Sequence, residues 1–295
     1  MIDLIRVIEH LTIVAPFGVS FWDGVTESVV GTGLSVVAYR PVDPANRISA
    51  FPNGRGVYVL RSLPGMHAFE HGEGDANFWA NLPVPRRSYV IEVRDSGRSF
   101  QPFLFMAELP VQGLFNWECG PVSSPLSPLD TTNLVPLYSA PTRSVPGGMA
   151  VLRADLWDAQ ANAPAAWALL EAQIEGQAPV QGFADVMGRV ALIFPYPKPI
   201  TFVPGSPGVP PQAANTALTE QEWSVQLQAF YARLSPVPSI PDLCATLAQP
   251  PADLWADVAQ TGILAGVTLR FGQELVVQSK DAPSVLLITP AVSPP

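Results

Sequence analysis

The chain has 295 residues, of which 48% are hydrophobic and only 14% charged, and its net charge is −9 at pH 7. This length predicts two domains, with a single large one as the alternative. So few charges predict a surface partly covered by other proteins. The 16 Lys and Arg residues form no basic run, which argues against nucleic acid as a partner. No stretch of about 20 apolar residues is present, so we expect no direct membrane span.

The N-terminal part shows a pattern typical of short strands. Proline, present 33 times, cannot donate a ladder hydrogen bond and favours short strands with rigid connectors over long helices. Runs of β-branched and apolar residues between turn residues, at spacings near ten residues, are typical of an antiparallel sandwich. They predict strands at 11–15, 33–41, 56–65, 87–97 and 101–110.

Two stretches interrupt this pattern. Residues 65–83, "GMHAFEHGEGDANFWANLP", are glycine-rich, and we predict a long loop with one helical turn, a kind of segment that is often functional. Phe78 and Trp79 in it are candidate interface anchors, and simple packing within the loop is the alternative. Residues 119–148 are rich in Pro, Ser and Gly and predict an extended linker. The predicted domains are therefore 1–118 and 149–295.

The second domain also predicts strands, together with short helices. The segment 164–176 is ambiguous because its Ala and Leu content favours a helix, and we choose a strand. Pro241 and Asp242 form a helix start signal in 239–258. Further strands are predicted at 148–159, 188–197, 222–233, 266–279 and 284–291. The predicted fold class is mainly β: two tandem antiparallel β-sandwich domains with short helices in the second.

Two segments about 130 residues apart echo each other: "ISAFPNGRGVYVLRSLPG" at 48–65 and "VQGFADVMGRVALIFPYP" at 180–197. Each runs through a polar turn and a Gly-Arg pair into an alternating strand that ends at proline. The spacing is too long for a solenoid repeat. It predicts two domains of related topology.

No residue pattern predicts a catalytic, cofactor or metal site. His67 and His71 have the i, i+4 spacing of a metal pair on a helix, but the surrounding glycines favour polar loop residues, and we keep both as interface candidates. Asp185 precedes a Gly-Arg turn, for which a turn-forming role suffices. The Asp-Ser-Gly stretch at 95–97 is explained by hairpin chemistry. We therefore expect no enzyme and no cofactor.

Cys119 and Cys244 are the only cysteines, too few for a secreted disulfide framework. We expect both to be reduced, with a single bridge as the alternative. The N-terminal "MIDLIRVIEH" carries Asp3 and Glu9 and lacks a basic n-region, so we do not interpret it as a signal peptide. This predicts a protein made in the cytoplasm.

The stretches "PAAWALLEAQI" and "GFADVMGRVALIFPYP" resemble the carboxypeptidase-regulatory-like, or transthyretin-like, β-sandwich. The first copy departs from that pattern by having Asn53 and Gly54 in place of the acidic turn. The resemblance implies a noncatalytic binding or scaffolding module.

Most of the chain also resembles accessory proteins of bacterial extracellular contractile injection systems, the phage-tail-like particles. The segments that carry this resemblance are "YVIEVRDSGRSFQPFLFMAELP", "GFADVMGRVALIFPYP" and "LRFGQELVVQSKDAPSVLLITPA". It implies a structural cap adaptor that joins the tail terminator to the tube or sheath, as a ring-forming homo-oligomer assembled in the cytoplasm and released on lysis. A baseplate component, a carbohydrate- or protein-binding accessory module, and a hydrolase with an unrecognised site remain as alternatives.

Overall fold

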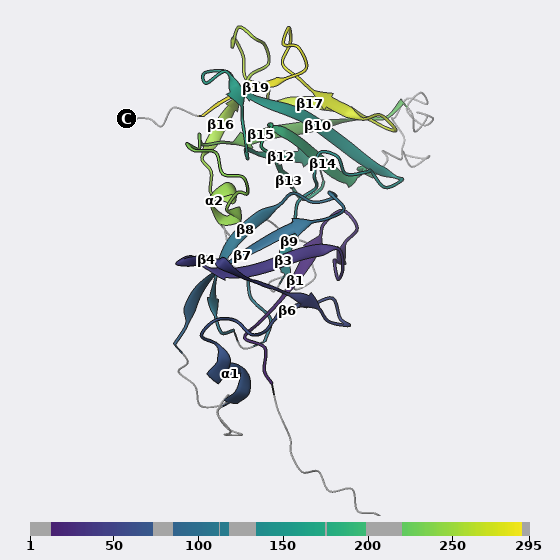
Figure 1. Cartoon of the computed structure of the whole chain (residues 1–295). Helices are drawn as coiled ribbons and strands as arrows, with labels where there is room; N and C mark the ends of the chain where they lie inside the picture. Colours follow the sequence, from purple (N-terminus) through teal and green to yellow (C-terminus); the bar gives the residue numbers. More distant parts are fainter. Residues whose placement is uncertain are drawn as a thin grey trace, which may run out of the picture.

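The structure, a computed structural model, describes residues 13–72, 85–111, 113–117, 134–174, 176–198 and 220–290. Figure 1 shows two β-rich domains stacked on one another. The described part contains two helices of five residues each, α1 (His67–His71) and α2 (Leu243–Leu247). The predicted mainly β class is confirmed. Helix α1 lies in the first domain, where one helical turn was predicted within 65–83, and α2 lies in the second.

The N-terminal domain consists of two sheets that share one core. One sheet has the order β4-β3-β7-β8, and the other has the order β2-β1-β6-β5 with β9 added beside β1. Along β8, Phe103, Phe105, Ala107 and Leu109 are buried and alternate with more exposed residues, so one face of the strand points into the core. The strands are β1 (Phe17–Asp23), β2 (Ser28–Val29), β3 (Leu34–Arg40), β4 (Asp43–Ser49), β5 (Phe51–Pro52), β6 (Tyr58–Leu60), β7 (Arg87–Asp95), β8 (Phe103–Leu109) and β9 (Leu134–Leu137).

Strand β9 corrects the predicted linker. It pairs in parallel with β1, and the carbonyl of Tyr138 just after it accepts a hydrogen bond from the Gln101 N–H. Residues 134–138 therefore belong to the first domain, whereas 118–133 lie outside the described residues. Pro136 did not prevent this strand because, among the described strands, β9 pairs with β1 alone, and proline is tolerated in such an edge strand.

The C-terminal domain is organised around β10 (Met149–Asp158). The first half of β10 pairs with β14 and β18, and its second half pairs with β11 and β19, so this strand joins the two parts of one sheet system. The described residues of 164–176, which exclude residue 175, include strands and no helix, as predicted. The other strands are β11 (Ala163–Pro164), β12 (Leu169–Ile174), β13 (Val180–Phe183), β14 (Arg189–Pro195), β15 (Glu222–Phe230), β16 (Pro251–Leu254), β17 (Gly266–Arg270), β18 (Leu275–Val277) and β19 (Leu286–Pro290).

The sequence echo proves to be a repeated turn. The side chain of Asn53 accepts hydrogen bonds from the N–H groups two and four residues on, and Asp185 does the same. Three residues after each lies a glycine with positive φ, Gly56 at 78° and Gly188 at 79°. This is a tight turn closed by an Asn or Asp side chain and a left-handed glycine.

The strands that flank these two turns are connected differently. β5 and β6 pair with each other, whereas β13 pairs with β12 and β14 pairs with β10. The echo therefore reflects shared turn chemistry, and the prediction of a shared domain topology from it is not supported at these strands.

Candidate functional site at the domain junction

The predicted interface residues fall in two groups. His67 and His71 lie on α1, with ring centroids 4.3 Å apart, and His67 is exposed. Glu70 between them is buried and accepts a hydrogen bond from the Leu63 N–H, so it faces the fold. The described ranges contain no group of three or more His, Cys, Asp or Glu side chains that could hold a metal ion. Phe78 and Trp79 lie outside the described residues.

The two domains share an apolar core at their junction. One cluster of buried residues joins Tyr138 and the β8 side chains of the first domain to Trp167, Phe183 and Leu243 of the second. The rings of Tyr138 and Phe183 are 5.1 Å apart. Because this contact is made by buried aromatic side chains, separating the domains would expose a large apolar area to water.

Trp167 is held at this junction in an unfavourable backbone conformation. Its φ is +63°, in the left-handed region that bulky residues avoid, and it is 2% exposed. The indole Nε1 donates to the Pro238 carbonyl at 3.0 Å, and Gln249 Nε2 donates to the Trp167 carbonyl at 2.8 Å. Such a conformation persists only where the surrounding contacts fix it firmly.

Backbone and amide hydrogen bonds also cross the junction. The Leu104 N–H of β8 donates to the Pro241 carbonyl at 2.9 Å. Gln101, which is 3% exposed, donates through Nε2 to the Phe183 carbonyl at 3.2 Å. The residue after Pro241 is Asp242, whose side chain accepts from the Ala245 N–H and caps α2, as the start signal predicts. The cap thus sets the path of the chain that meets β8.

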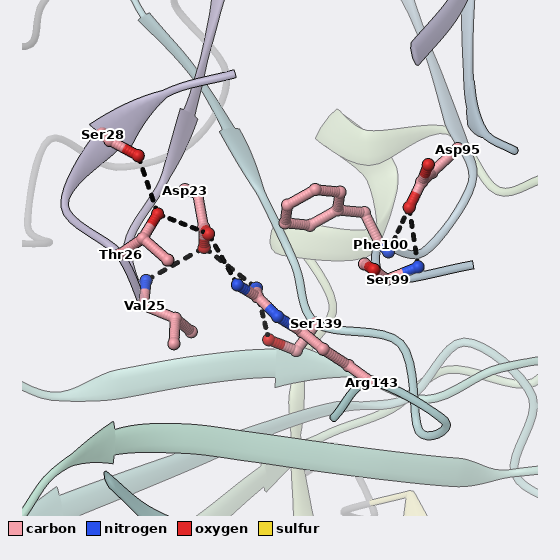
Figure 2. A network of polar contacts seen from close by, with 9 residues as sticks. All are labelled: Asp23, Val25, Thr26, Ser28, Asp95, Ser99, Phe100, Ser139 and Arg143. Atoms are coloured by element: carbon pink, nitrogen blue, oxygen red, sulfur yellow. Dashed lines mark hydrogen bonds and ion pairs between the residues drawn. The ribbon is translucent and has the colours of Figure 1, made fainter. Parts of the chain in front are cut away.

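A buried ion pair lies on the first-domain side of the junction (Figure 2). Arg143 donates from Nη1 to Asp23 Oδ1 at 2.9 Å and from Nη2 to Asp23 Oδ2 at 2.6 Å. The side chains are 8% and 4% exposed. Arg143 also donates to the Ser139 hydroxyl at 3.2 Å, and its guanidinium carbon lies 4.8 Å from the centre of the Phe100 ring. The two-pronged contact joins the end of β1 to the segment after β9.

The pKa of Asp23 is lowered by this environment. Burial disfavours the charged carboxylate, but hydrogen bonds from Arg143, from the Thr26 hydroxyl at 2.7 Å and from the Val25 N–H at 3.0 Å outweigh it. Asp23 is therefore ionised at neutral pH and is fully occupied by its partners. These contacts point to a structural role for the pair.

Arg153 of β10 ties the second domain to the same segment. It donates to the carbonyls of Pro141 and Arg143, the latter at 3.3 Å, and pairs with Glu274 at 2.8 Å. Val25, next to the Asp23 turn, packs against Val151 of β10 in a small buried cluster. The ion pair of the first domain is thus connected directly to the central strand of the second.

Sequence reasoning missed both members of the ion pair. Asp23 and Arg143 are 120 positions apart, so no local pattern joins them. One signal was available: Arg143 is the sole charged residue between Asp130 and Arg153. A lone arginine in an uncharged segment needs a partner if that segment is buried.

Cys244 of α2 is disulfide-bonded, and none of the described cysteines is free. The expectation of a reduced thiol is therefore wrong for Cys244. The other cysteine of the chain, Cys119, lies outside the described residues. Two cysteines 125 positions apart give no sequence signal for a bridge, because pairing depends on where the fold brings their Cα atoms.

Comparisons with known proteins do not assign a family. No family model matches the chain, and no curated protein matches it. Among solved structures, the C-terminal fragment of the pilus adhesin SpaC from Lactobacillus rhamnosus GG aligns at 10% identity over 94% of this chain and 100% of that one, with a TM-score of 0.18. A predicted adhesin from Bacteroides ovatus aligns at 12% identity over 90% and 94%, with a TM-score of 0.17. Both scores are too low to carry an argument.

Proposed function

We propose that this chain is a noncatalytic structural subunit of a contractile injection system, a cap adaptor that joins the tail terminator to the tube or sheath as a ring-forming homo-oligomer. The observation that carries the proposal is the joined pair of domains. An adaptor must hold two contact surfaces in a fixed relative orientation. Domains of one chain usually move relative to each other unless their interface is large and apolar. Here a shared aromatic core, the Asp23–Arg143 pair and Arg153 connect the two domains.

The carboxylates with lowered pKa values support a noncatalytic role. Asp23, Glu92 and Asp158 each have a pKa below the ordinary value, and each accepts hydrogen bonds from an arginine that outweigh the effect of burial. Structural ion pairs account for all three shifts. The pKa of Asp257 is also lowered, in this case by hydrogen bonds from the hydroxyl and the N–H of Thr261 in the same turn. All four carboxylates are thus engaged in structural contacts.

The decisive experiment is deletion of the gene, followed by electron microscopy of the particles. A cap adaptor predicts tails of wrong length, or sheaths lost or contracted from the capped end. Loss of the opposite end would favour the baseplate alternative. Normal tails with intact ends would refute a role in either position.

Complementation with two variants tests whether the junction matters for assembly. Arg143→Leu breaks the buried ion pair with Asp23. Arg270→Leu breaks the ion pair with Glu222, in which both side chains are about half exposed. We expect the Arg143 variant to give fewer complete particles and the Arg270 variant to restore normal tails. Equal restoration by both would contradict the requirement for joined domains.

The disulfide bears on where the protein resides. Disulfides persist in oxidising surroundings and are rare in the cytoplasm. A subunit assembled in the cytoplasm and later released on lysis would form the Cys244 bond only after release. Neither described helix is long and apolar enough to cross a membrane. Thiol labelling of particles from intact cells and from lysates would test this order of events.

A further inference from the structure

A hollow lined by both polar and apolar residues lies on the outer face of the second domain, at β12, β15 and β17. Its volume is about 610 Å³. Along β15, Val225 and Ala229 are buried in the core, whereas Ser224, Gln226 and Gln228 are exposed and line the hollow. These three residues form a row of uncharged hydrogen-bonding side chains that faces solvent. Alternate residues along an antiparallel strand lie about 6.8 Å apart.

The neighbouring strands extend this row into a two-dimensional array. Glu171 of β12 lies opposite Gln228, and Gln173 lies opposite Gln226. On the other side, Gln226 faces Gly266, which has no side chain to fill the hollow. Directly opposed residues in an antiparallel pair have Cβ atoms about 5 Å apart. A ligand lying across the strands would thus meet several carboxamides at once.

Part of this array is already hydrogen-bonded and part is free. Gln173 donates to the Gln177 carbonyl at 2.9 Å, and Glu171 accepts from Gln181 at 2.7 Å. The side chains of Ser224, Gln226 and Gln228 make no hydrogen bond with any residue that the structure describes. One hydroxyl and two carboxamides therefore offer both donors and acceptors.

The chemistry of the lining excludes several ligand classes. No Lys or Arg is among the described residues that line the hollow, so a phosphate would find no cation there, and the carboxylate of Glu171 would repel it. The described lining offers one carboxylate, which is too few for a calcium site. An apolar ligand would cover free carboxamides without satisfying them. β15 is paired on both sides, so it cannot accept an added strand at its edge.

We propose that this hollow binds a neutral oligosaccharide through Ser224, Gln226 and Gln228. A sugar hydroxyl both donates and accepts, and so matches a carboxamide, which offers the same two functions. Ile263 at the rim is 54% exposed and gives the C–H face of a sugar ring an apolar contact. The hollow is open to solvent, so the expected Kd is on the order of 1 mM. This inference is independent of the proposed role in a particle.

The test is a titration of the purified ¹⁵N-labelled protein with cellotetraose, maltotetraose and triacetylchitotriose, followed by NMR chemical shifts. We expect at least one of these probes to shift amide signals of β12, β15 and β17. Gln226→Ala combined with Gln228→Ala should weaken that binding by at least about tenfold. Gln278→Ala changes an exposed glutamine outside the hollow and should leave the Kd unchanged.

Two outcomes would overturn the inference. One is the absence of any shift with all three sugars up to about 10 mM, a concentration well above the expected Kd. The other is binding that the double variant leaves intact while its thermal unfolding matches the wild type, which would place the sugar elsewhere. Neither result would bear on whether deletion of the gene causes a particle defect, so the two proposals can fail separately.

Discussion

Replacing Arg143 by leucine removes the positive member of the buried ion pair and leaves the Asp23 carboxylate 4% exposed. Two charge-assisted hydrogen bonds are lost, each worth about 1.5–3 kcal/mol. Breaking a buried pair by removing one partner typically costs about 3–5 kcal/mol. Thr26 and the Val25 N–H still compensate part of the charge, so we expect a loss within that range.

The assay is urea unfolding at pH 7, followed by tryptophan fluorescence and circular dichroism. The matched control is Arg270→Leu, which removes an arginine from an exposed pair with Glu222 and should cost no more than about 1 kcal/mol. A second variant, Asp23→Leu with Arg143→Leu, replaces both charges by apolar groups. It should recover much of the loss, because the main cost is an unpaired buried charge.

The pH dependence gives the sharpest check. In the wild type the pKa of Asp23 is lowered, so its contribution to stability is present above the ordinary value of 3.8 and is lost as the pH falls through the lower folded value. In the Arg143 variant, burial without the arginine raises the pKa of Asp23, and protonation at acid pH then relieves the unpaired charge. The two stabilities should converge between about pH 6 and about pH 3. A loss below about 1 kcal/mol, or one that stays constant with pH, would refute this reasoning.

Three further predictions address other parts of the fold. Gly188→Ala should destabilise the protein by more than about 2 kcal/mol in thermal unfolding, because Gly188 has a φ of +79° and an added Cβ would clash with the Leu156 carbonyl oxygen. The control is Gly147→Ala, which should leave the unfolding temperature unchanged because the space around Gly147 is open. Asp242→Ala should cost about 1 kcal/mol in urea unfolding through loss of the α2 cap, and a fully retained midpoint would contradict the capping role. Reduction by dithiothreitol should lower the midpoint of urea unfolding, and Cys244→Ser should lower it by the same amount without reductant. A midpoint that does not change with reductant would argue against the disulfide.

Local patterns predicted most of the strands because the signal for each lies within the strand itself. The strand predicted at 11–15 is wrong, because residues 13–15 form no strand and β1 begins at Phe17. β8 alternates buried and exposed residues, and Asp242 stands at the start of α2, so both could be located from residue types alone. The edge strand β4, "DPANRIS", was missed because nearly all of it is exposed and it carries no apolar alternation. Its place in the sheet depends on the pairing with β3.

The junction could not be predicted from the sequence for a different reason. Its contacts join residues that are distant in the chain: Asp23 with Arg143, Gln101 with Phe183, and Leu104 with Pro241. Composition marked 119–148 as a linker because Pro and Ser are common in connecting segments. Residues 134–137 of this segment form a strand because they pair with β1, and β1 is in place only in the folded first domain.

The distribution of arginine suggests which domain faces a partner. Of the 16 basic residues only two are lysine, Lys198 and Lys280, and interfaces are enriched in arginine and depleted in lysine. Every described arginine of the second domain forms an ion pair within the chain: Arg153, Arg189, Arg233 and Arg270. In the first domain, five exposed arginines form none with the described residues: Arg55, Arg61, Arg86, Arg87 and Arg98. Of these five, Arg61 lies over the Phe51 ring, with its guanidinium carbon 4.9 Å from the ring centre, so the other four are the better candidates to pair with a carboxylate of another subunit. In the proposed adaptor, we therefore expect the first domain to contact an acidic surface, while the second, whose described arginines are paired, leaves its hollow free.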